Sequence, residues 1–194
     1  MNGWEELCMN SDTISHIVKG LKNKYKECDP FELCKSLNII IGMVPMGTHD
    51  GSCKGFFISR GRKKMITINS ELQPALQRII AAHELGHAAL HGDTFGISAF
   101  HDFMVFDAVD HREYEANVFA AELLLEDEDV LLRLNDDISF FQAAAELRVP
   151  PELLDFKFRI LKRKGYQVID PPLMATGSFL KSIDMDALCS EELP

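Results

Sequence analysis

Two histidines and a glutamate form the pattern His-Glu-x-x-His at His83, Glu84 and His87. Residues four apart lie on one face of an α-helix, separated by a rise of about 6 Å, so both imidazoles can converge on one metal ion. Imidazole nitrogens bind Zn²⁺ at about 2.0–2.1 Å. Glu84 is turned by about 100° from His83, which favours contact with a water molecule over contact with the same ion. The pattern indicates a hydrolytic metal centre in which Glu84 is the catalytic base.

The residues around this motif predict a buried helix. Ile79-Ile80-Ala81-Ala82 precede the first histidine and Ala88-Ala89-Leu90 follow the second, so apolar and small side chains flank both. Gly86 costs about 1 kcal/mol relative to alanine inside a helix, which predicts close approach of a neighbouring backbone or a ligand there. The alternative is that the two histidines are ordinary core or surface residues, and the apolar setting argues against it.

A zinc hydrolase needs a third protein ligand and one open coordination position. His91 lies four residues beyond His87, but in a continuous helix it is about 12 Å along the axis from His83, too far for one ion to bridge. We therefore expect His91 to close the helix, with Gly92 as its stop.

Residues 110–125 offer a better third ligand. Their apolar side chains recur with helical period and predict one buried stripe: Ala116, Phe119, Ala120, Leu123 and Leu124. Glu113 falls on this stripe, whereas Glu115 and Glu122 are expected on a more polar face. A carboxylate at an apolar interface is costly unless it is paired or bound to metal, which favours Glu113 over Glu115 as the ligand. A solvated acid at the helix start is the alternative interpretation of Glu113. Asn117, one turn on, is predicted to hydrogen-bond a ligand side chain.

Several segments, in this order, resemble the ImmA/IrrE family of metallopeptidases. They are the stretch from Asp29-Pro30-Phe31 to Gly55-Phe56, the strand Ile66-Thr67-Ile68-Asn69, the His83-to-His91 run, and Glu113-x-x-Ala116-Asn117-x-Phe119-Ala120-x-x-Leu123-Leu124. The resemblance covers residues 12–125 and implies a zincin-like core. It also implies His83, His87 and Glu113 as metal ligands and Glu84 as the catalytic base. One departure is Glu126, where family members commonly carry proline, and it concerns the end of the second helix.

The resemblance further implies a substrate class. Some family members cleave a helix-turn-helix repressor of a phage or mobile element, which switches on genes after stress. The expected cofactor is one zinc ion per chain, with manganese or iron as alternatives for two imidazoles and a carboxylate.

Composition is compatible with this function. The 194 residues suffice for one domain with a small appendage, and 46% hydrophobic and 26% charged residues are ordinary for a globular protein. A net charge of −10 is unfavourable for binding nucleic acid and compatible with a basic protein as substrate. The five cysteines show no C-x-x-C pair, which argues against a disulfide framework. Without a signal peptide or a run of membrane-spanning length, we expect a cytoplasmic protein with no membrane partner.

The hydrophobic pattern predicts an α+β fold. Helices are expected over 11–27, capped by Ser11 or Asp12, and over 30–37, capped by Asp29. Strands are expected over residues 38–45, 53–59 and 64–69, the last two joined by a hairpin turn at 60–62. Beyond the second motif helix, the acidic run 126–129 starts a helical hairpin, followed by helices over 139–147 and 150–164.

These elements predict three regions. A zincin-like metallopeptidase domain, with a small three-stranded sheet and two motif-bearing helices, spans residues 11–126. A helical subdomain packed on it spans 127–165, and a loosely ordered tail spans 166–194. The edge of the sheet would accept an extended peptide as an added strand.

The residues that complete the site are less determined. Four aromatic residues between the motif helices could line a specificity pocket or close the core: Phe95, Phe100, Phe103 and Phe106. A tetrahedral oxyanion needs a second electrophile besides the metal, and the candidates are Tyr114, His111, His101 and His49.

Two other classes of function stay open from the sequence. The first is a DNA-binding regulator that uses the C-terminal helical hairpin and has a vestigial metal site. Its basic residues, between Lys157 and Lys164, come late in the second helix rather than at the end that would read bases. The second is a non-catalytic module that sequesters a repressor without cutting it.

Overall fold

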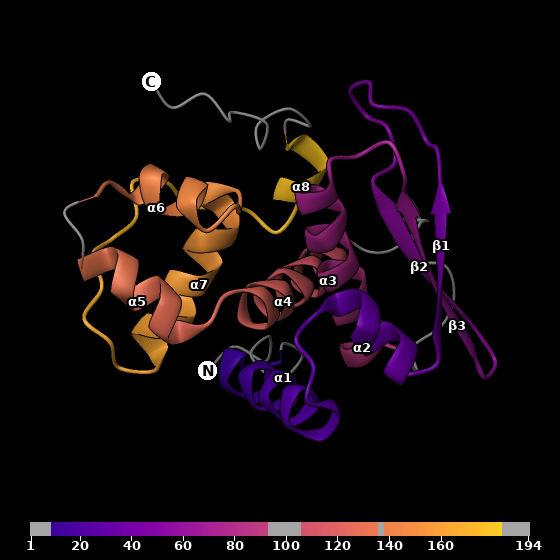
Figure 1. Ribbon diagram of the computed structural model, residues 1–194, viewed down its shortest axis with the longest axis horizontal. Helices are drawn as coiled ribbons and strands as arrows, with labels where there is room; N and C mark the ends of the chain where they lie inside the picture. Colours follow the sequence, from indigo (N-terminus) through magenta and orange to yellow (C-terminus); the bar gives the residue numbers. More distant parts are fainter. Residues whose placement is uncertain (1–8, 93–105, 136–137, 184–194) are drawn as a thin grey trace.

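A computed structural model of the chain describes residues 9–92, 106–135 and 138–183 (Figure 1). Two helices lead into three strands: α1 (Ser11–Tyr25), α2 (Pro30–Ser36), β1 (Ile39–Val44), β2 (Gly55–Arg60) and β3 (Lys63–Asn69). The helices that follow are α3 (Pro74–Leu90), α4 (Phe106–Leu124), α5 (Asp127–Asn135), α6 (Phe140–Glu146), α7 (Pro151–Arg163) and α8 (Phe179–Ser182). The fold is α+β, as the sequence predicts.

Most predicted helix ends are confirmed. The Asp29 side chain accepts hydrogen bonds from the backbone N–H groups of Phe31 and Glu32 at 2.9 and 3.2 Å, which starts α2 at Pro30. His91 caps α3 and donates its backbone N–H to the His87 carbonyl at 2.9 Å. α1 begins at Ser11 as predicted, but its cap is neither Ser11 nor Asp12. Asn10 is the N-cap, because its side chain accepts from the Asp12 N–H.

The described strands form one sheet in the order β1-β3-β2. β1 runs parallel to β3, and β2 pairs with β3 antiparallel across a hairpin turn in which Gly61 has φ +62°. The antiparallel pairing confirms the predicted hairpin. Glycine suits its turn, because glycine adopts a positive φ without strain. α3 packs against β2 and β3, and α2 packs against β1. β2 is therefore the edge strand beside the motif helix.

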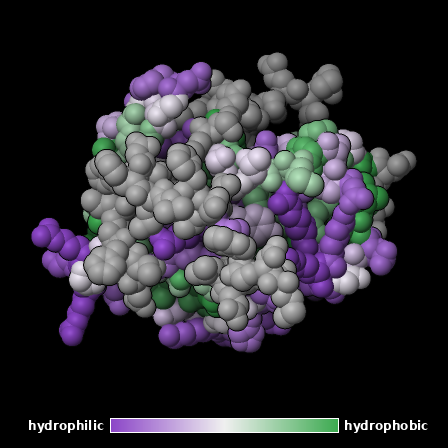
Figure 2. Space-filling model, turned by 180° about the vertical axis from the view of Figure 1, so that it is seen from behind, coloured by the Kyte–Doolittle hydropathy of each residue, from purple (hydrophilic) through white to green (hydrophobic). Residues whose placement is uncertain are grey.

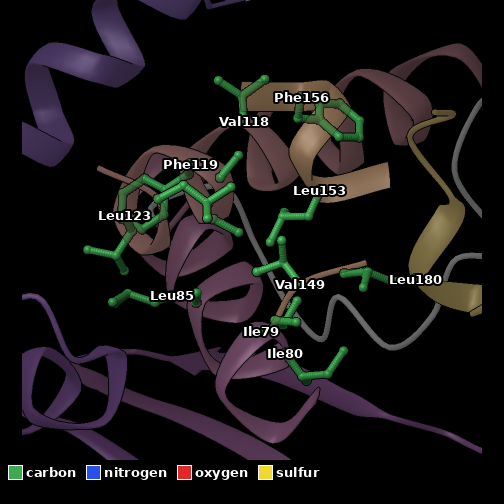
Figure 3. Packing of buried hydrophobic residues seen from close by; sticks show 14 of the residues in the cluster. Ile79, Ile80, Leu85, Val118, Phe119, Leu123, Val149, Leu153, Phe156 and Leu180 are labelled. Atoms are coloured by element: carbon green, nitrogen blue, oxygen red, sulfur yellow. The ribbon is translucent and has the colours of Figure 1, made fainter. Parts of the chain in front are cut away.

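α3 and α4 lie between the sheet on one side and helices α5–α7 on the other (Figure 1). The buried hydrophobic residues form one cluster that crosses this whole arrangement. Figure 3 shows Leu85 of α3, Phe119 and Leu123 of α4, and Leu153 and Phe156 of α7 within it. The helices after residue 126 thus share their hydrophobic core with the two motif helices.

α3 and α4 approach each other closely at Gly86. A Cβ on Gly86 would lie 3.1 Å from the Cα and 3.2 Å from the carbonyl oxygen of Ala116, and 3.2 Å from the Cβ of Phe119. This confirms the predicted close approach of a neighbouring backbone. Because Gly86 precedes His87 and Ala116 lies one turn after Glu113, the contact is at the level of the candidate ligands.

Two acidic residues of α4 are buried, contrary to the prediction of a more polar face. Glu115 is 4% exposed and accepts the Met9 backbone N–H. Glu122 is 9% exposed and accepts from the Nζ atoms of Lys157 at 2.7 Å and Lys164 at 2.6 Å. Both lysines also contact Asp127, so α4, α5 and α7 meet at an ion-pair network. The prediction was wrong because all of these partners are remote in sequence.

Part of the predicted loose tail is packed against the rest of the protein. Ala175, Phe179 and Leu180 are buried, and Phe179 lies against Phe156 with 5.8 Å between ring centroids. The Ala175 N–H donates to Asp155 at 2.9 Å. The prediction is therefore wrong for residues 175–180, which pack on α7, whereas residues 166–174 are mostly exposed and 184–194 lie outside the described residues.

Among the residues coloured in Figure 2, hydrophobic positions lie in separate patches between hydrophilic ones. Within the described part of the chain, no helix is both long and apolar enough to cross a membrane.

The tight contact at Gly86 predicts opposite effects for two glycine substitutions. Gly86→Ala should lower the free energy of unfolding by about 1–3 kcal/mol, because the added methyl pushes against the α4 backbone. Gly20→Ala, in helix α1 with open space around the new Cβ, should raise it by up to about 1 kcal/mol. Urea denaturation of the metal-free protein measures both, and stabilisation by Gly86→Ala would disprove the tight contact.

The ion-pair network predicts a pH-dependent loss of stability. Burial raises the pKa of Glu122, but Lys157 and Lys164 outweigh burial and hold it below its ordinary value of 4.5. A lowered pKa contributes stability above pH 4.5 that is lost as the pH falls through the folded-state pKa. Glu122→Gln should therefore cost about 3 kcal/mol at pH 7 and less in acid. Glu128→Gln, exposed on α5, is the matched control. If Glu122→Gln costs the same stability at every pH, the charge argument is contradicted.

Candidate metal centre

Three side chains from α3 and α4 converge in the core. His83 and His87 lie one turn apart on α3, and their Nε2 atoms are 3.1 Å apart. The two carboxylate oxygens of Glu113 on α4 lie 3.4 Å from these atoms, Oε2 from His83 and Oε1 from His87. All three residues are buried, and their candidate ligand atoms lie within 4.8 Å of one another.

This donor set fits a divalent metal ion. In a tetrahedral zinc site with bonds of about 2.0–2.1 Å, ligand atoms lie about 3.3 Å apart, close to the separations between His83, His87 and Glu113. Burial of three polar side chains in an apolar core, with their binding atoms close together, costs free energy unless a bound group such as a metal ion connects them. Two imidazoles and one carboxylate also leave one coordination position open.

The electrostatics of the metal-free group follow from the same proximity. Burial raises the pKa of Glu113, but hydrogen bonds and charges from His83 and His87 outweigh it, so the pKa is well below its ordinary value. Burial opposes protonation of His83, yet Glu113 and Asn117 raise the pKa of that imidazole overall. Glu113 is thus an anion at neutral pH, which is the form that binds metal.

Asn117 contacts a candidate ligand, as predicted. It is fully buried, and its Oδ1 lies 2.8 Å from Nδ1 of His83. Its Nδ2 donates to the carbonyl oxygen of Gly177 at 2.6 Å. Because Oδ1 can only accept, Nδ1 of His83 carries the proton, which leaves Nε2 as the ring nitrogen that can bind a metal ion.

Glu84 lies beside this group without belonging to it. Its carboxylate is buried, and Oε2 has no hydrogen-bond partner among the described residues. Burial raises the pKa of Glu84 most, although His87 and His83 oppose that and the backbone N–H of Phe57 also lowers it. A raised pKa brings the carboxylate nearer the range in which it can both take and return a proton.

His91 and Glu115 form a separate contact next to the site. Nε2 of His91 lies 3.4 Å from Oε2 of Glu115, and its ring centroid is 5.6 Å from that of His87. Burial, followed by the charges of His87 and Arg112, lowers the pKa of His91 to about 4. His91 is therefore neutral at pH 7, and Glu115 faces His91 rather than the group of three.

The other predicted site residues are not brought to the ligand group by any described contact. Tyr114 packs on Phe156, with 5.4 Å between ring centroids, and His111 and His49 are exposed. His101, Phe95, Phe100 and Phe103 lie outside the described residues, as does the side chain of Phe106.

Sequence reasoning missed two contributions to the site because both come from the backbone. The Phe57 N–H on edge strand β2 bonds to Glu84, and the Gly177 carbonyl bonds to Asn117. A Cβ on Gly55 would lie 2.5 Å from Cγ2 of Ile80, so glycine at the start of β2 lets this edge approach α3. Gly55 at the start of the Gly55-Phe56-Phe57 sequence is the residue from which this close approach could have been predicted.

The chain is similar in sequence to known proteins. A model of the IrrE N-terminal-like domain family matches residues 34–159. The chain is 37% identical over 144 residues to an immunity region protein of Bacillus phage phi105, covering 74% of this chain and 88% of the relative. It is 28% identical over 173 residues to the metallopeptidase ImmA of Bacillus subtilis, covering 86% and 96% of the two chains.

A third relative is the radiation response metalloprotease IrrE of Deinococcus deserti. The identity is 36% over 88 residues, which cover 45% of this chain and 29% of the relative. The chain belongs to the ImmA/IrrE family. Membership implies a divalent metal, and His83, His87 and Glu113 are a group that could hold it.

The geometry predicts which acid on α4 binds metal. Glu113→Gln should weaken zinc binding at least about a hundredfold, because it removes the anionic ligand. Glu115→Gln makes the same chemical change two residues away and should leave zinc binding unchanged. Competition with a chromophoric chelator measures both affinities, and tight binding by Glu113→Gln would remove Glu113 from the site.

His83→Ala tests the partner helix in the same way. It should lose the ion, so elemental analysis of the purified variant should find far less than one equivalent where the parent protein holds one.

Proposed function

We propose that this protein is a zinc-dependent metalloendopeptidase that hydrolyses a peptide bond in a cytoplasmic protein, a helix-turn-helix repressor of a phage or mobile element. The observation that carries the proposal is the convergence of His83, His87 and Glu113 beside a buried Glu84 whose Oε2 is unpartnered among the described residues. Family membership supports metallopeptidase chemistry. Similarity to a phage immunity region protein supports the choice of substrate.

The roles of the residues follow from their positions. A divalent metal, when bound, acidifies water and polarises a carbonyl group. Glu84 accepts the proton from the attacking water and returns it to the leaving amine. The Phe57 N–H holds the Glu84 carboxylate, so this side chain is already ordered before the reaction. Asn117 holds His83 in the tautomer that leaves Nε2 free.

The substrate is expected to bind in extended form along β2. This strand is an edge of the sheet and packs against α3, so a peptide added to it would pass the Glu84 carboxylate. A net charge of −10 favours a basic partner such as a DNA-binding protein.

The DNA-binding alternative has a structural difficulty. Its recognition helix would be α7, whose residues Leu153 to Phe158 are all buried. A helix with this stretch packed in the hydrophobic core cannot enter a DNA groove without unfolding. We therefore favour a protein substrate.

Replacement of the base separates an enzyme from a binding module. Glu84→Gln should keep the metal, the fold and repressor binding but lower the rate of cleavage at least about a hundredfold, since proton transfer is lost. The assay incubates purified protein with a candidate repressor, with and without chelator, and follows cleavage by mass spectrometry.

Glu146→Gln, at an exposed position on α6, is the matched control and should cleave normally. Cleavage by Glu84→Gln at the parent rate would show that Glu84 is not the base. If the metal-loaded parent protein binds the repressor and releases it intact, the protein is a sequestering module.

A further inference from the structure

The segment after α7 reaches the candidate metal centre. It lies beyond residue 159, where the match to the family model ends. Gly177, in a turn before α8, directs its carbonyl oxygen at Asn117 Nδ2, at 2.6 Å. Asn117 is fully buried and in turn contacts His83. A continuous chain of hydrogen bonds therefore joins the C-terminal segment to a candidate ligand.

The direction of these hydrogen bonds determines the state of His83. A carbonyl oxygen only accepts, so Gly177 requires the NH₂ group of Asn117 on its side. The Asn117 oxygen must then face Nδ1 of His83, which requires a proton on Nδ1. In a neutral imidazole this leaves Nε2 unprotonated, the form that binds metal. With the amide turned over, NH₂ would face Nδ1 and favour the tautomer with a proton on Nε2.

The segment is held at several points by α7. The backbone N–H of Ala175 donates to Asp155 Oδ2 at 2.9 Å, and its carbonyl accepts from Arg159 at 2.8 Å. Asp155 and Arg159 also pair with each other. On the far side of Gly177, Phe179 is 4% exposed and packs against Phe156. Gly177 is thus fixed between a backbone clamp and a buried ring.

We propose that residues 173–180, here called the C-terminal strap, are a positioning element of the metal centre. By holding the Gly177 carbonyl against Asn117, the strap sets the amide orientation and thereby the His83 tautomer that presents Nε2. This inference rests on the proposed function for its metal ligands, but the tautomer of His83 can be measured without any metal.

The test compares two Phe→Ala substitutions in the full chain. Phe179→Ala removes the ring that holds the strap on Phe156. Phe140→Ala removes a buried ring of α6 that packs on Phe158 of α7, 5.2 Å between centroids, and leaves the strap alone. Both remove a buried ring and should lower the urea midpoint of unfolding by similar amounts. Phe179→Ala alone should also weaken zinc binding, by about 10–100-fold in competition with a chelator.

A double-mutant cycle identifies the route. Asn117→Ala should weaken zinc binding by a similar factor, and Phe179→Ala combined with Asn117→Ala should be no weaker than either alone within about twofold. If the double variant loses zinc affinity by the product of the two single losses, the inference is overturned. It is also overturned if Phe140→Ala loses as much zinc affinity as Phe179→Ala. If Phe179→Ala does not fold, Asp155→Asn replaces it in the test, because it keeps the size of the side chain but weakens the contact with Ala175.

The ¹⁵N chemical shifts of the His83 ring provide the second readout. At a pH high enough for His83 to be neutral, metal-free parent protein should show a proton on Nδ1 alone, and Phe179→Ala should show a mixture of both tautomers. An unchanged tautomer in Phe179→Ala would overturn the role of the strap. Absence of zinc binding by the parent protein would instead refute the proposed function, while the tautomer result would still decide the strap.

Discussion

The separation of α3 and α4 at Gly86 determines what the site can do. With no side chain there, the α4 backbone approaches to van der Waals contact, and the Glu113 oxygens come to 3.4 Å from the two Nε2 atoms. One added methyl group at this position would separate the carboxylate from the imidazoles. Since a metal site tolerates errors of only a few tenths of an ångström in its ligand distances, the backbone contact is as much a part of the centre as the ligands.

The rest of the chain can be understood as support for this contact from both sides. The sheet packs on α3 and brings the Phe57 N–H to Glu84. On the opposite side, α7 packs on α4, and its Lys157 neutralises the buried Glu122. The helices outside the motif therefore fix the position of α4 with charges as well as apolar contacts, and buried ion pairs of this kind select one arrangement more than they add stability.

The sequence predicted most of what depends on local order. Helical and strand periods, the Asp29 cap and the Gly86 contact all follow from neighbouring residues. Glu113 was chosen because it falls on an apolar stripe, yet Glu115 is equally buried. What distinguishes them is that Glu113 faces the imidazoles of α3 and Glu115 faces His91, a consequence of helix rotation that no local pattern contains. The packing of residues 173–180 was missed for the same reason, because its partners Asp155 and Asn117 lie 20 and 60 residues away from Ala175 and Gly177.

Ligands on two different helices have a consequence for the lifetime of the protein in the cell. An ion held by His83, His87 and Glu113 would cross-link α3 to α4, whose ends are separated by residues 91–105 of the sequence, so opening of the core would require its release. Free ion at a hundred times its dissociation constant adds about 2.7 kcal/mol to stability by mass action. Because cellular proteases degrade opened chains, the amount of this protein would then follow the supply of the metal, with no change in its synthesis.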